Sequence, residues 1–167
     1  MGEDQGQGPS FRSRKRELST KLVSSIEAAT RSRLLTVSVD TLLREVAQLL
    51  SSTQISLVVV CDQAGAMAGV VTKTDIVRQI GHLAGAACTR TAADIMTRDV
   101  TFCRATDCLP EVLAMMQARG FVHVPVIDAA GTPTGVVNAR DALRELLAEG
   151  QYEEALLRDY VMGVGYR

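Results

Sequence analysis

Two short stretches of this chain place an aspartate three residues after a hydroxyl or amide side chain. Thr72 precedes Asp75, and Asn138 precedes Asp141, each time directly after Gly-Val-Val. The apolar stretch predicts a strand, so each pair lies where a strand passes into a helix. The N-terminus of a helix attracts anions, and a carboxylate in its first turn can accept hydrogen bonds from both hydroxyls of a ribose. The spacing therefore indicates two candidate nucleotide sites.

A second interpretation of the same spacing needs no ligand. A Thr or Asn followed three residues later by Asp is also a helix-capping pattern. Two cations follow the junction residues, Lys73 and Arg140, and each can neutralise a phosphate or remain solvated. Apolar residues of the preceding strands, Ile55 and Leu57 in the first half and Val122 in the second, offer a slot for a flat base. The sequence leaves both interpretations open.

The two stretches belong to an internal duplication, which is the first feature to seek in a new sequence. A shift of 66 positions places G-V-V at 69–71 on G-V-V at 135–137 and Asp75 on Asp141. The D-x-x-G sequences at 62–65 and 128–131 coincide as well, and no gap is needed between residues 43 and 144. The chain is therefore predicted to contain two copies of one structural unit.

Each half predicts the same order of elements. Residues 34–39 and 100–103 are short β-prone stretches, and an amphipathic helix follows each of them. Strands are expected at 55–61 and 67–71, and again at 121–127 and 134–137, with each pair joined by its D-x-x-G turn as a hairpin. A second helix starts near residues 73 and 139. The predicted fold class is α+β, with two β-α-β-β-α units that cover each other's apolar sheet faces about a pseudo-two-fold axis.

These motifs resemble the cystathionine beta-synthase-type (CBS) domain family. The resemblance rests on G-V-V-T-K-T-D at 69–75, G-V-V-N-A-R-D at 135–141, H-V-P-V-I-D at 123–128 and D-I-M-T at 94–97, and it extends over roughly residues 18–160. It implies two CBS motifs packed as one module, with two clefts that commonly bind AMP, ADP, ATP or S-adenosylmethionine. It also implies disk-like homodimers and a regulatory role toward an attached or associated protein.

The resemblance also gives expected roles to individual positions. Thr97 lies in the linker position that often touches the ligand, and His123 lies where the family often places a basic side chain. Leu57 replaces such a basic residue in the first half, and Pro125 shapes the strand of the second. Asn138 stands where Ser or Thr is usual. These correspondences group Thr97, His123 and Pro125 with the second cleft, although His123 can instead be a hydrogen-bonded histidine between the motifs.

Composition limits the function classes. The 167 residues are 47% hydrophobic and 22% charged, as in globular proteins, and the net charge of −1 argues against a nucleic-acid partner. No apolar stretch approaches the ~20 residues that span a bilayer, and the N-terminus lacks a signal-peptide core, so we expect a cytoplasmic protein without a membrane partner. Four cysteines and two histidines show no zinc-site spacing, and no catalytic motif is present. We therefore expect no metal, no required cofactor and no enzymatic activity.

The sequence thus favours a regulatory module that binds adenosine nucleotides. The alternative is a ligand-independent module that dimerises or docks an unidentified regulated protein. The expected boundaries are a disordered basic and polar tail at 1–16, motif 1 with a leading helix at 17–86, motif 2 at 87–150, and a C-terminal helix and tail at 151–167. A homodimer is predicted to bury apolar helix faces. Its candidate surface comprises Leu42, Val46, Ile76, Leu109, Val112 and Leu143.

Overall fold

The computed structural model describes residues 21–82 and 89–148, so the predicted tail at 1–16 and the predicted C-terminal helix lie outside the described residues. The first half contains β1 (Thr36–Ser38), α3 (Leu43–Ser52), β2 (Leu57–Cys61), β3 (Met67–Thr72) and α4 (Lys73–His82). The second half contains α6 (Leu109–Arg119), β4 (His123–Ile127), β5 (Pro133–Asn138) and α7 (Ala139–Ala148). A leading segment, η1 (Val23–Ile26) with α2 (Glu27–Ser32), precedes the first half, and α5 (Ala92–Ile95) precedes the second.

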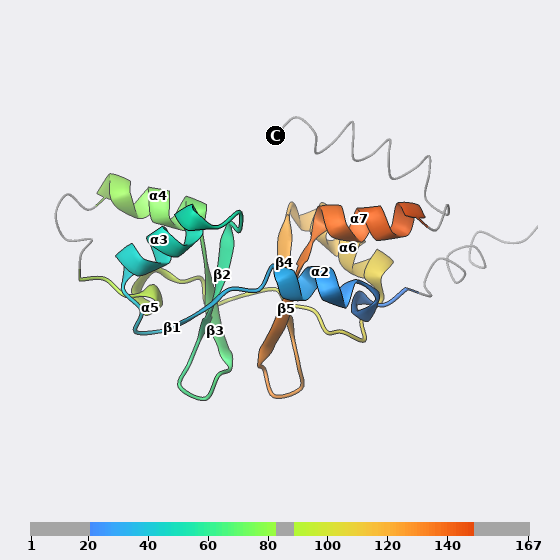
Figure 1. Cartoon of the computed structure of the whole chain (residues 1–167), viewed down its shortest axis with the longest axis horizontal. Coiled ribbons are helices and arrows are strands. Elements are labelled where there is room, and N and C mark those ends of the chain that lie inside the picture. The colour runs from blue at the N-terminus through green and yellow to red at the C-terminus, as the bar shows by residue number, and fades with distance from the viewer. Residues whose placement is uncertain (1–20, 83–88, 149–167) are drawn as a thin grey trace, which may run out of the picture.

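Both halves are built around an antiparallel hairpin. Strand β2 pairs with β3, and β4 pairs with β5, in registers that coincide under the 66-residue shift. The hairpins lie side by side in the middle of the molecule, with α3 and α4 on one half and α6 and α7 on the other (Figure 1). Their tips are joined directly, because the Met67 N–H donates to the Gly131 carbonyl at 2.9 Å. The α+β class and the paired arrangement are therefore confirmed.

One expected strand is missing from the second half. In the first half β1 runs parallel to β2, and the Val59 N–H donates to the Leu35 carbonyl. The position equivalent to Val59 is Pro125, which has no N–H to donate. Residues 100–103 therefore form only an isolated bridge between Cys103 and Val126, and β4 and β5 make a two-stranded sheet.

Apolar side chains form three clusters. Helices α3 and α4 bury one face of the first sheet, and helices α6 and α7 bury one face of the second. The third cluster lies between the halves, where Leu57, Val59 and Val70 pack against Val136. This central cluster shows that each sheet covers the other's apolar face, as the sequence predicts.

The sequence-based prediction of the residues that form the dimer surface is wrong. Five of the six candidates are buried within the chain itself, and Leu42 is half-buried. The reason is that each amphipathic helix places its apolar stripe on its own sheet. Within the described residues, the exposed large apolar side chains of the helices are instead Val77 and Ile80 of α4, at 68% and 70% exposure.

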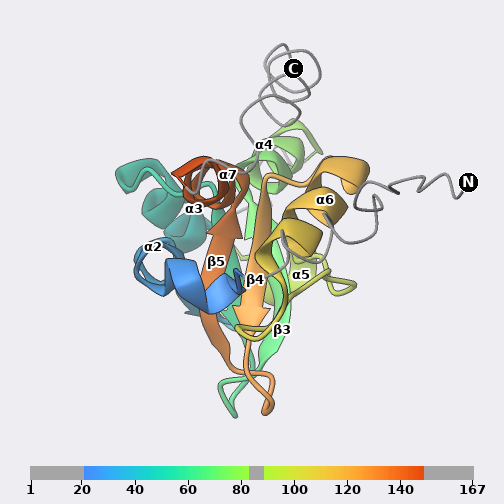
Figure 2. The same cartoon turned by 90° about the vertical axis from the view of Figure 1, so that its right-hand side faces the viewer.

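The leading segment packs on the second half, although it precedes the first half in sequence. Helix α2 lies against β5 (Figure 2), and Val23 and Ile26 join the apolar cluster beneath α6 and α7. The segment that precedes the second half makes the reciprocal crossing, because the Val70 N–H donates to the Thr97 carbonyl at 3.0 Å. Each linker therefore covers the sheet of the other half. No helix in residues 21–82 or 89–148 has the length and apolarity to cross a bilayer.

Two glycines permit these crossings, and we expect their substitution to be costly. A Cβ on Gly69 would lie 2.6 Å from the Thr97 carbonyl oxygen, and one on Gly135 would lie 2.7 Å from Oγ1 of Thr30. Gly69→Ala and Gly135→Ala should each destabilise the fold by about 1–3 kcal/mol, as measured by chemical denaturation. Gly81→Ala is the control, because a Cβ there meets open space in a helix and should be neutral or stabilising. If all three variants were equally stable, the close packing of the two linker segments on β3 and β5 would be contradicted.

Candidate functional site

A pocket of about 540 Å³ lies between the halves, within the range of small-molecule sites. It is bounded by the end of β3 and the start of α4, by the linker after α5, and by the segment that joins α6 to β4. Gly120 ends α6 with a φ of 71°, a left-handed conformation that favours glycine, and the chain then turns into the pocket wall. The lining residues are Ser56, Leu57, Val70, Thr72, Lys73, Thr74, Thr97, Asp99, Val100, Thr101, Gly120, Phe121, Val122, His123 and Pro125.

The first junction, Thr72 to Asp75, forms a reciprocal cap at the edge of this pocket. The Asp75 N–H donates to Thr72 Oγ1 at 3.2 Å, and the Thr72 N–H donates to Asp75 Oδ2 at 2.9 Å. The Lys73 N–H donates to the Ser56 carbonyl at 3.0 Å. These three N–H groups at the start of the helix are thus already bonded within the chain. The capping interpretation is present in the structure, and it uses one of the two oxygens of Asp75.

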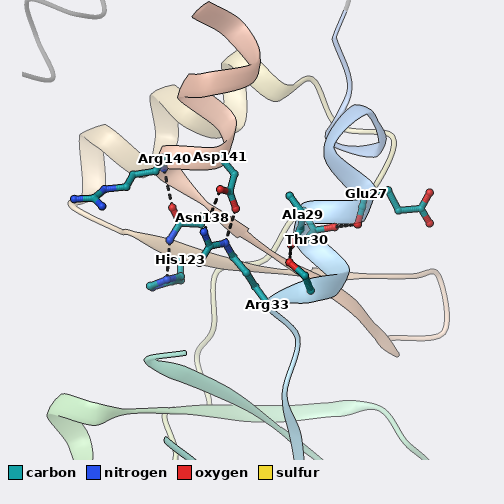
Figure 3. A network of polar contacts seen from close by, with 9 residues as sticks. Glu27, Ala29, Thr30, Arg33, His123, Asn138, Arg140 and Asp141 are labelled. Carbon is teal, nitrogen blue, oxygen red and sulfur yellow. Dashed lines mark hydrogen bonds and ion pairs between the residues drawn. The ribbon is translucent and has the colours of Figure 1, made fainter. Parts of the chain in front are cut away.

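The second junction, Asn138 to Asp141, has a different set of contacts (Figure 3). Asn138 is only 7% exposed, and its Oδ1 accepts the Arg140 N–H at 2.8 Å. Its Nδ2 lies 3.0 Å from His123 Nε2. Because the Asn138 amide nitrogen can only donate, Nε2 is the unprotonated nitrogen of His123 and Nδ1 carries the proton. Both the oxygen and the nitrogen of the Asn138 side-chain amide are therefore hydrogen-bonded within the chain.

Asp141 is bound by an arginine from the leading segment. Arg33 Nη2 donates to Asp141 Oδ1 at 3.1 Å, and Arg33 Nε donates to Asp141 Oδ2 (Figure 3). The carboxylate side chain is only 10% exposed, and the arginine side chain is 34% exposed. Hydrogen bonding to Asp141 raises the pKa of Arg33, although burial opposes this. The geometry is that of a two-pronged guanidinium–carboxylate pair, which is among the stronger polar contacts in proteins.

The pocket contains seven of the twelve residues that the sequence marks as candidates: Leu57, Thr72, Lys73, Thr97, Val122, His123 and Pro125. The other five, Ile55, Asp75, Asn138, Arg140 and Asp141, are not part of its lining. The expected grouping also differs, because Thr97 and Pro125 line the pocket at the first junction, and His123 lines this pocket while it also contacts Asn138 of the second junction. The cause is the crossing of the linkers, which brings the strand entrance of one half to the helix start of the other.

Eight lining residues were not among the candidates. They are Ser56, Val70, Thr74, Asp99, Val100, Thr101, Gly120 and Phe121. The linker residues at 99–101 follow Thr97 closely, so their proximity to Thr97 was an available signal. Nothing in the local pattern marks the segment at 120–121, because its place in the pocket depends on how the halves pack.

The positive and negative charges that line the pocket nearly cancel. Lys73 and Asp99 carry opposite charges and are both exposed. Burial lowers the pKa of His123, the positive charge of Arg33 lowers it further, and Asp141 opposes this change. His123 is therefore neutral at neutral pH and offers a ring N–H rather than a positive charge.

Stability should consequently fall as the pH drops below about 6.5. A histidine whose pKa is lower in the folded state contributes stability above its unfolded pKa, and this contribution is lost as the pH falls through the folded pKa. Protonation would also remove the acceptor of Asn138. We expect the melting temperature to fall more between pH 7.5 and 5 in the wild type than in His123→Gln. His82→Gln, at the exposed end of α4, should behave as the wild type. Identical profiles for wild type and His123→Gln would contradict this role.

Another reactive group in the described part of the chain is the buried thiol of Cys103. Burial raises the pKa of the Cys103 thiol to about 12, so it stays protonated at neutral pH. Among residues 21–82 and 89–148, no group of three or more His, Cys, Asp or Glu side chains could hold a metal ion.

Comparisons with known proteins agree with this architecture. The family model described as "CBS domain" matches residues 23–82 and 92–148. The Meiotically up-regulated gene 70 protein of Schizosaccharomyces pombe is 31% identical over 134 residues, which are 74% of this chain and 18% of that protein. The chain thus spans less than a fifth of this curated relative.

Two solved structures show the same fold. The CBS domain pair of protein MJ0100, in complex with 5′-methylthioadenosine and S-adenosyl-L-methionine, gives a TM-score of 0.65 at 23% identity over 77% of this chain and 98% of that chain. CBSX2 in complex with AMP gives 0.66 at 21% identity, again over 77% and 98%. The family match extends over both halves and most of the residues, and the chain therefore belongs to the CBS-domain family, with one CBS domain in each half.

Proposed function

We propose that this chain is a regulatory module that binds an adenosine nucleotide in the pocket at the first junction. The observation that carries the proposal is the pocket itself, which joins Thr72, Lys73 and Thr74 at the start of α4 to apolar walls from both halves, with Asp75 hydrogen-bonded to Thr72 behind this lining. The ligands named for the two solved relatives, AMP and S-adenosyl-L-methionine with 5′-methylthioadenosine, all contain adenosine. CBS domain pairs are typically regulatory rather than catalytic, and the proposal gives the chain no catalytic step.

Each part of such a ligand has a chemically suitable group. Asp75 uses Oδ2 in the helix cap, so Oδ1 is the oxygen that we assign to the ribose hydroxyls. Leu57, Val70 and Pro125 offer apolar surface to the base. At the charged end, Lys73 favours a phosphate and Asp99 favours a cationic group, such as the methionine part of S-adenosylmethionine.

Thermal melting with a ligand panel tests the proposal. A ligand that binds only the folded state adds about 2.7 kcal/mol at a hundredfold excess over its Kd, which corresponds to several degrees in Tm for a chain of this size. AMP, ADP, ATP and S-adenosylmethionine should be compared with GMP as a base control. At least one adenosine ligand should raise the Tm while GMP does not. No shift with any of them at millimolar concentration would exclude the proposal.

The alternative function is a ligand-independent module for dimerisation or partner docking. One observation favours an interaction surface, namely the exposure of Val77 and Ile80 on α4. Dimerisation is compatible with nucleotide binding, so only the absence of binding would favour this alternative as the main function.

A further inference from the structure

The two junctions are equivalent by sequence but differ in what lies against their aspartates. At the second junction, both carboxylate oxygens of Asp141 accept hydrogen bonds from Arg33. The position equivalent to Arg33 under the 66-residue shift is Asp99, which lines the pocket at the first junction. A carboxylate cannot form an ion pair with Asp75. The duplicated unit therefore carries an arginine in one copy and an aspartate in the other, at positions that correspond under the 66-residue shift.

The backbone around Arg33 holds the arginine in this place. Arg33 directly follows α2, and its N–H donates to the Thr30 carbonyl at 3.3 Å. Thr30 is 4% exposed and packs on Gly135 so closely that a Cβ on the glycine would lie 2.8 Å from the Thr30 Cβ. The start of the Arg33 side chain is thus fixed against β5, the strand that leads into the second junction.

The remaining polar groups of the second junction are also bonded within the chain. Asn138 uses its oxygen for the Arg140 N–H and its nitrogen for His123 Nε2. In the described residues, no buried side-chain nitrogen or oxygen is left without a hydrogen-bond partner. A ribose at the second junction would have to displace a guanidinium that already makes two hydrogen bonds to Asp141.

We propose that Arg33 is an internal occupant of the second junction, where it takes the place of a ligand and limits the chain to one adenosine nucleotide. The inference rests on the proposed function, because it uses the same ribose-binding role for the junction aspartate. It predicts that removal of the Arg33 side chain creates a second site at Asn138–Asp141. The chain is then a module in which one site senses a nucleotide and the other is closed by its own leading segment.

Calorimetric titration with AMP tests this inference through the number of sites. The wild type should bind one AMP per chain, and Arg33→Ala and Arg33→Gln should each bind two. Arg31→Ala is the matched control, since Arg31 is an exposed arginine two residues away that pairs with Glu27. It should retain one site. Asp75→Ala should weaken the wild-type site at least tenfold, and the double variant Asp75→Ala/Arg33→Ala should keep one AMP site of unweakened affinity.

A nuclear magnetic resonance measurement on the wild type covers the case in which the Arg33 variants do not fold. The Arg33 Nε–H should give a protected signal that Asp141→Asn removes and that saturating AMP leaves in place. Loss of this signal on saturation, or two sites in the wild type, would overturn the inference and leave the proposed function intact. Folded Arg33 variants with only one site would overturn it as well. If the wild type binds no adenosine ligand, the proposed function fails, and the inference fails with it unless Arg33→Ala gains a site.

Discussion

Asp75→Ala should weaken adenosine-nucleotide binding at least tenfold, whereas Asp141→Ala should leave it unchanged. The first substitution removes a charged acceptor for the hydrogen bonds that the ribose hydroxyls would donate, and such bonds contribute roughly 1.5–3 kcal/mol. The second removes a carboxylate whose two oxygens are already bound to Arg33 at the other junction. Calorimetry with the best ligand of the melting panel measures both affinities.

The effects of the two substitutions on the free energy of unfolding should not follow their effects on binding. Asp75→Ala loses a helix cap of about 1 kcal/mol. Asp141→Ala leaves the guanidinium of Arg33 without its acceptor, at a cost of about 1–3 kcal/mol, which is moderated because water can reach the arginine. Chemical denaturation should therefore find Asp141→Ala at least as unstable as Asp75→Ala, although only Asp75→Ala loses binding.

A ribose analogue controls for indirect effects of the Asp75 substitution. A 2′,3′-dideoxyadenosine nucleotide lacks the hydroxyls that we assign to Asp75 Oδ1. It should bind the wild type weakly and lose little further affinity in Asp75→Ala. Unchanged binding of the parent nucleotide by Asp75→Ala would mean that this aspartate is only the helix cap seen in its contacts with Thr72.

The second large effect is expected on assembly. We expect the wild type to sediment at about twice its 17.9 kDa mass, and Val77→Glu/Ile80→Glu to sediment as a monomer. Under the 66-residue shift, Val77 and Ile80 correspond to Leu143 and Leu146, which are buried in the cluster that includes the leading segment. In the described residues of the first half, no such cover protects Val77 and Ile80.

A two-fold contact through α4 would bury these side chains from both copies, and full burial of each contributes roughly 1.5–3 kcal/mol. The introduced carboxylates would lose their hydration in the same contact, so association should fail. The control is Gln63→Glu/Ala64→Glu, which adds equal charge on the exposed turn of the first hairpin, at the end of the molecule away from α4 (Figure 1). It should remain dimeric. A monomeric wild type at micromolar concentration, or a dimeric α4 variant, would contradict this surface.

Much of the architecture was predictable because its signals are local. The duplication, the two hairpins and the amphipathic helices follow from hydrophobic periodicity and turn residues, and the structure contains them with small changes in their bounds. The strand at 100–103 was predicted in error, but the cause is itself local. Pro125 removes the N–H that would pair this strand with β4, and the sequence displays that proline.

The sequence by itself determined the repeat, the elements and the two junctions at which a helix follows a strand. Only the tertiary structure decided which surfaces meet at those junctions. The crossing of the linkers brings Thr97 to Thr72 and Arg33 to Asp141, 108 positions further along the chain, and the packing of the halves brings His123 to the same pocket as Thr72. Such contacts depend on how two apolar sheet faces pack, and this packing has no signature in local spacing. The two aspartates therefore look alike in sequence, and they differ because a guanidinium lies against only one of them.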